Sequence, residues 1–135
     1  MPTPNADRAS RKHLWLLAFL AAAALFLALA ISRSVYDLTS PGNWPLHLLA
    51  RKLYSIVAFA IIGYFFGETA AESGSPARPL VAGGAIGLYS LCIEVAQHFV
   101  GSHEGFRSNV ADVAAGIIGG AIGGAIALIR RGITV

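Results

Sequence analysis

Hydrophobic residues along the chain gather into four long runs, which are separated by short polar segments. A helix rises about 1.5 Å per residue, so about 20 apolar residues cross the ~30 Å hydrocarbon core of a bilayer. The runs are close to this length. They predict an all-α fold, an integral membrane bundle of four transmembrane helices. The expected spans are 14–31, 46–67, 80–100 and 109–129, within a membrane domain of residues 14–131.

Residues 1–13 form a short basic tail before the first apolar run. Its prolines argue against regular structure, and we expect an irregular segment that faces the cytoplasm. Basic residues, an apolar stretch and then Ala28-Leu29-Ala30 also resemble a signal peptide with its cleavage site. Whether the first span is cleaved is left open at this stage.

Composition agrees with a bilayer protein. The chain is 56% hydrophobic and 13% charged, whereas soluble domains average about 25% charged residues. The net charge of +3 is small and no basic face carries interleaved aromatic residues, so nucleic acid is not an expected partner. One cysteine, Cys92, excludes an intramolecular disulfide. No cofactor or metal site is expected, because His98 has no histidine partner at helical spacing.

Four spans place both termini on the same side of the membrane. Basic residues are enriched on the cytoplasmic side of membrane proteins. The side with the termini would hold six of them and the other side four, which favours cytoplasmic termini. The six are Arg8, Arg11, Lys12, Arg78, Arg130 and Arg131; the four are Arg33, Arg51, Lys52 and Arg107.

Polar side chains end the third span and open the fourth. Ionisable residues inside apolar spans are costly, and they are usually functional or paired. The link between these two spans is short, so the helices are expected to be antiparallel neighbours with their polar residues at one mouth of the bundle. The second span begins at the same side. The candidate cluster consists of Glu94, Gln97, His98, Arg107, Asn109, Asp112 and Lys52.

Three roles for this cluster remain open. It could be a buried network in which Arg107 neutralises Glu94 or Asp112. It could be a pocket for an anionic or sugar-bearing envelope lipid, with Lys52 and Arg107 as cationic clamps. It could also perform acid–base catalysis through Glu94, His98 or Asp112.

Glycines mark the faces where helices are expected to approach closely. Small residues four apart are typical of helix contacts in membranes. We expect packing within the chain; homodimerisation is an alternative, and the oligomeric state is open. The packing residues are Gly83 and Gly87 in the third span and Gly116, Gly119, Gly120, Gly123 and Gly124 in the fourth.

The second half of the chain resembles the VanZ-like membrane proteins. The resemblance lies in Glu94-x-x-Gln97-His98, a short loop with Arg107, and Asp112 opening a Gly-rich last span. It implies a small bacterial multi-span protein of the cell envelope, located in the inner membrane. It also implies that Glu94, Gln97, Arg107 and Asp112 are the functional positions.

The second span departs from the family pattern, which typically opens with Asp-Lys and a following His. Arg51 stands at the Asp position and Ser55 at the His position. His47 and Asp37 are the candidates to replace those groups.

The expected function is a binding or accessory role toward a cell-wall or lipid-linked component through the outer-face polar cluster. The candidate partners are a membrane lipid and a cell-wall precursor or glycopeptide-related ligand. Two alternatives are a small intramembrane enzyme that acts on an envelope lipid or glycan, and a structural subunit of a membrane complex. The sequence does not specify the ligand.

Overall fold

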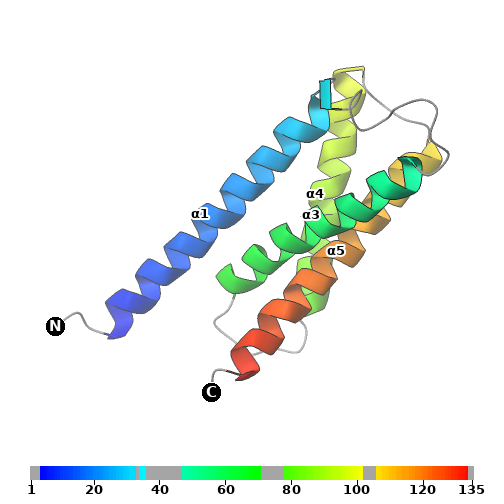
Figure 1. Ribbon diagram of the computed structural model, residues 1–135. Helices are drawn as coiled ribbons and strands as arrows, with labels where there is room; N and C mark the ends of the chain where they lie inside the picture. The colour runs from blue at the N-terminus through cyan, green and yellow to red at the C-terminus, as the bar shows by residue number, and fades with distance from the viewer. Residues whose placement is uncertain (1–3, 33, 36–46, 71–77, 102–105, 134–135) are drawn as a thin grey trace.

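A computed structural model gives the arrangement of the four helices (Figure 1). It describes residues 4–32, 34–35, 47–70, 78–101 and 106–133, and no strand occurs among them. The helices are α1 (Pro4–Ile31), α3 (His47–Thr69), α4 (Arg78–Phe99) and α5 (Phe106–Ile133).

Each of these helices contains a stretch that is long and apolar enough to cross a membrane. The stretches are Ala9–Ile31, Leu49–Thr69, Arg78–Phe99 and Ser108–Gly132. The predicted all-α, four-span architecture is therefore confirmed. The segment 36–46, which includes Asp37, lies outside the described residues.

The helices extend beyond the apolar runs from which they were predicted. α1 begins at Pro4, so the segment expected to be irregular is helical from this residue onward. A proline is compatible with a first helical turn, where no backbone N–H donor is needed. The 28 residues of α1 amount to about 42 Å, which matches the hydrocarbon core together with both headgroup regions. Polar helix ends can thus lie in the headgroup regions.

Glu68, Arg78 and Arg107 also lie in helices, although the sequence suggested loops for all three. Glu68 is in the last turn of α3, Arg78 opens α4, and Arg107 is in the first turn of α5. The connecting segments are shorter than the polar stretches suggested.

α5 packs along both α3 and α4, whereas α1 packs against α3 and α4 (Figure 1). The buried core contains Phe59, Ile62, Ile86, Ile93 and Ala115, and α1 covers it with apolar side chains. The Phe26 ring meets the edge of the Phe59 ring at a centroid distance of 4.9 Å. α1 thus covers a core that is formed by α3, α4 and α5.

Two rows of glycine on α5 permit its close approach to two neighbours. Gly116, Gly120 and Gly124 face α4, and Gly119 and Gly123 face α3. A Cβ atom on Gly120 would lie 2.7 Å from the Ala82 carbonyl oxygen, and one on Gly119 would lie 2.6 Å from the Ile56 carbonyl oxygen. A Cβ atom on Gly123 would overlap the Ala60 carbonyl oxygen.

Two glycines of α4 allow the same close approach from the other side of its contact with α5. A Cβ atom on Gly83 would lie 3.0 Å from the carbonyl oxygen of Ile117, and one on Gly87 would lie 2.5 Å from Cγ1 of the same residue. All seven predicted packing glycines therefore lie against another helix of the same chain. The close packing that they allow is within one molecule.

Candidate functional site

The polar residues of the third and fourth spans gather at one end of the bundle. α1 and α4 end there, and α3 and α5 begin there (Figure 1). Because consecutive helices are antiparallel, residues 52, 94 and 112 come together although they are far apart in the sequence. α1 begins and α5 ends at the opposite end, the end with the termini (Figure 1).

An ion pair between α3 and α5 is the centre of the cluster. The Lys52 ammonium lies 2.6 Å from Oδ2 of Asp112, and each side chain is 19% exposed. The same ammonium donates to the Ser108 hydroxyl at 3.0 Å and to the Ser108 carbonyl oxygen at 3.4 Å. Ser108 and Asp112 are one helical turn apart on α5, so both can reach the same cation. Lys52 is thus held by groups of the protein.

A serine on α4 fixes the backbone at the same level. Ser90 is buried, and its hydroxyl donates to the Asp112 carbonyl oxygen at 2.9 Å. The space beside it depends on Gly116, since a Cβ atom there would lie 2.7 Å from Cβ of Ser90. The position of Asp112 is therefore set from both α3 and α4.

Glu94 and Gln97 occupy the next turns of α4. Glu94 is only 8% exposed, one turn beyond Ser90. Gln97 donates from Nε2 to the Ala30 carbonyl oxygen of α1 at 2.9 Å. The two residues that the resemblance singled out on α4 thus lie at the inner wall and at the contact with α1.

Two further residues of the predicted cluster, His98 and Asn109, lie near the same end of the bundle. His98 is exposed, and its ring lies near the Phe99 ring at 6.3 Å. Asn109 lies near the start of α5, and its Oδ1 atom is buried with no hydrogen-bond partner among the described residues. The side chains of Arg107 and His47 lie outside the described part of the structure, so the predicted pairing of Arg107 stays a prediction.

A pocket of about 200 Å³ opens beside this cluster, among all four helices. One part of its wall is polar and the other is apolar. The polar part consists of Arg51, Tyr54, Ser55, Ser90, Glu94, Gln97 and Asp112; the apolar part consists of Phe26, Leu29, Ala30, Val35, Phe59 and Ile93.

Sequence reasoning missed several of these lining residues. Phe26, Leu29 and Ala30 come from a uniformly apolar run, which carries no signal for the side that faces a pocket. Tyr89 is a further missed contact, since its hydroxyl donates to the Ala23 carbonyl oxygen of α1 at 2.5 Å. Ser55 did have a signal, because it shares the Lys52 face of its helix.

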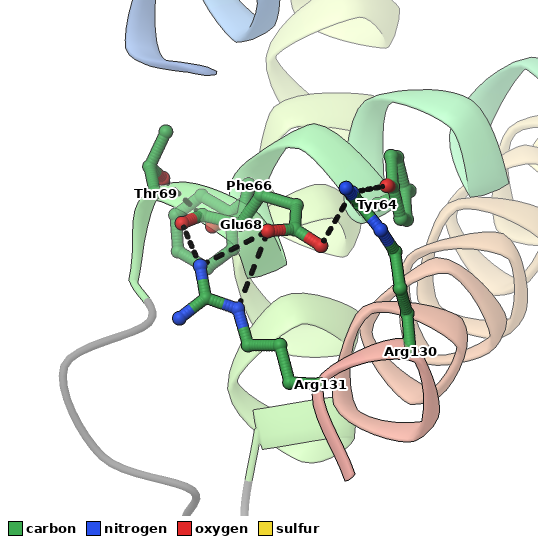
Figure 2. A network of polar contacts seen from close by, with 6 residues as sticks. All are labelled: Tyr64, Phe66, Glu68, Thr69, Arg130 and Arg131. Carbon is green, nitrogen blue, oxygen red and sulfur yellow. Dashed lines mark hydrogen bonds and ion pairs between the residues drawn. The ribbon is translucent and has the colours of Figure 1, made fainter. Parts of the chain in front are cut away.

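The opposite end of the bundle contains a second polar cluster that the sequence did not reveal (Figure 2). Glu68 of α3 is buried. It pairs with Arg130 at 3.2 Å and with Arg131 at 3.0 Å, both from α5. Arg130 also donates to the Tyr64 hydroxyl. These two arginines therefore hold α5 to α3.

The described residues contain no group of three or more side chains suited to holding a metal ion. Comparisons of the chain with known protein families, with curated proteins and with solved structures find no match.

Proposed function

We propose that this chain is a VanZ-like, multi-pass protein of the bacterial inner membrane that binds a sugar-bearing, lipid-linked component of the cell envelope. The observation that carries the proposal is the pocket at the Lys52–Asp112 end, with its one polar and one apolar wall. Amphiphilic ligands need one polar and one apolar wall, because their polar group must form hydrogen bonds while their chain stays away from water. The residues of the VanZ-like resemblance, Glu94, Gln97 and Asp112, line its polar wall.

The size of the pocket favours one small headgroup. Its volume of about 200 Å³ is below the roughly 300–1,000 Å³ typical of pockets for drug-sized ligands. A single sugar fits this space better than a whole lipid. The acyl or prenyl chain would leave along α1, where Phe26 and Leu29 supply an apolar surface.

The charges of the pocket favour a hydroxyl-rich group over a phosphate. Glu94 and Asp112 line it together with Arg51, so the lining has two negative charges and one positive charge, and the excess negative charge repels an anion at short range. Lys52 points its ammonium at Asp112 and Ser108, so it is engaged within the protein. Carboxylates and the Gln97 amide accept hydrogen bonds from sugar hydroxyls. A sugar therefore suits these groups better than the anion that the sequence left as an alternative.

The proposed orientation puts this pocket at the outer face, with both termini in the cytoplasm. The excess of basic residues at the end with the termini supports it. Single cysteines at positions 104 and 135, in a Cys92→Ser background, test it in intact cells. A membrane-impermeant maleimide should label position 104 and leave position 135 unlabelled; the reverse pattern would invert the orientation.

Binding is tested with defined lipids in native mass spectrometry. Glucosyl diacylglycerol, diacylglycerol and phosphatidylglycerol with identical chains are added to the detergent-solubilised protein. We expect Ser55→Leu, which fills the pocket, to abolish the preference for the glucosyl lipid over diacylglycerol. Ala111→Leu is the matched control, because it adds an apolar side chain on the exposed face of α5. Equal retention of the two neutral lipids by the unchanged protein would contradict the proposal.

A further inference from the structure

The net formal charge of this protein lies at one end of the bundle. Six basic and three acidic residues belong to the segments on the side of the bundle that has the termini. Their formal charge is +3. The segments at the pocket end contain four basic and four acidic residues and are neutral. The whole net charge of +3 is therefore at the end where Glu68 lies.

The arginines at this end are held in fixed positions around one carboxylate (Figure 2). Glu68 has a side chain that is 4% exposed. Arg131 donates to its Oε2 atom from Nη2 at 3.0 Å and from Nε at 3.3 Å, and to its carbonyl oxygen at 3.1 Å. Arg130 donates to Oε1 at 3.2 Å. Two guanidinium groups thus lie side by side, and each is fixed by the same buried anion.

Both guanidinium groups still reach the surface. The Arg130 side chain is 53% exposed and the Arg131 side chain is 38% exposed. A guanidinium has five N–H donors in a planar fork, a geometry that matches phosphate oxygens. The formal charge of +3 at this end of the bundle places the pair in a region of excess positive charge.

Aromatic residues indicate the depth of this pair in the membrane. The Arg130 guanidinium lies 5.5 Å from the centroid of the Trp15 ring, and that ring meets the Tyr64 ring edge-on at 5.9 Å. Tryptophan and tyrosine concentrate at the level of lipid headgroups. The arginines are therefore at the level where lipid phosphates lie.

We propose that Arg130 and Arg131, anchored by Glu68, bind the phosphate group of an anionic membrane lipid. Basic groups between helices at the cytoplasmic side recognise such headgroups. This site is separate from the pocket at the other end, and its test uses a different lipid and different residues. Inorganic phosphate would bind through the same hydrogen bonds, so the experiment must distinguish a lipid phosphate group from the free anion.

Native mass spectrometry of the full chain, with phosphatidylglycerol and phosphatidylcholine of identical chains, tests the site. The unchanged protein should prefer phosphatidylglycerol. Each arginine near a charged headgroup contributes about fivefold, so Arg130→Gln with Arg131→Gln should reduce the preference on the order of thirtyfold. Should the double variant fail to fold, the single Arg130→Gln variant should still show about a fivefold reduction.

The matched control is Arg11→Gln with Lys12→Gln, which removes the same charge from exposed positions of α1 at the same end. The preference should change less than threefold in this variant. An equal reduction in both double variants would overturn the proposal, because it would show general attraction to the membrane surface. Displacement of the lipid by millimolar inorganic phosphate would likewise overturn it in favour of a site for the free anion.

Discussion

The Lys52 ammonium lies 2.6 Å from the Asp112 carboxylate across the contact between α3 and α5. When one partner of a partly buried pair is removed, the charge of the other is left without compensation. We expect Lys52→Met to lower the free energy of unfolding by about 1–3 kcal/mol, and Asp112→Leu to do the same. The double variant should recover most of the loss, since both charges are then absent. Thermal unfolding of the detergent-solubilised protein measures all three.

Lys12→Met is the control for this pair, because Lys12 is an exposed cation on α1. Its effect should stay within about 0.5 kcal/mol, as for most surface substitutions. Strictly additive losses at residues 52 and 112 would show that the two charges do not stabilise each other.

Gly120 of α5 is in tight contact with α4, and it can be compared directly with Gly84 of α4, where a Cβ atom would have open space. A Cβ atom on Gly120 would lie 2.7 Å from a backbone oxygen of α4, whereas one on Gly84 would meet nothing within 4 Å. We expect Gly120→Ala to lower the free energy of unfolding by about 1–3 kcal/mol through overpacking. Gly84→Ala should be neutral or stabilising, because alanine is the better helix former. Equal thermal midpoints for the two variants would contradict the packing of α5.

Much of this fold could be predicted because a bilayer restricts the choices. A run such as 14–31 can only cross the membrane as a helix, and short links make successive helices antiparallel. The meeting of Lys52, Glu94 and Asp112 at one end follows from that topology alone. The particular ion pair does not follow, since Asp112 could equally have met Arg107.

The contacts of α1 and the Glu68 cluster could not be predicted for different physical reasons. Residues 14–31 of α1 are apolar on every side, so no periodicity distinguishes the face that carries Phe26 from the face toward lipid. Glu68 looked like a loop residue because polar residues follow it, and its partners lie more than sixty positions later. Such pairing depends on how α5 packs, which local sequence does not encode.

Two hydrogen bonds attach α4 to α1. Tyr89 donates to the Ala23 carbonyl oxygen and Gln97 to the Ala30 carbonyl oxygen, two turns further along α1. Polar contacts between membrane helices average about 0.6 kcal/mol, so Tyr89→Phe and Gln97→Leu should each lower the free energy of unfolding by about that amount. The two losses should add, because the sites are separate. Val95→Ala, on the exposed face of α4, serves as the control in the same thermal measurement.

Glu68 and Arg130 should respond unequally to substitution although they are partners. Glu68 is buried and holds two arginines, whereas Arg130 is half exposed and can be hydrated if its partner is lost. We expect Glu68→Gln to lower the free energy of unfolding by about 1–3 kcal/mol, because it weakens the charge-assisted hydrogen bonds of both arginines at once. Arg130→Gln should cost only about 0–1 kcal/mol, as for exposed pairs. The two thermal midpoints, measured at low and high salt, distinguish these effects. A loss for Arg130→Gln as large as that for Glu68→Gln would show that the carboxylate is not the anchor of this end.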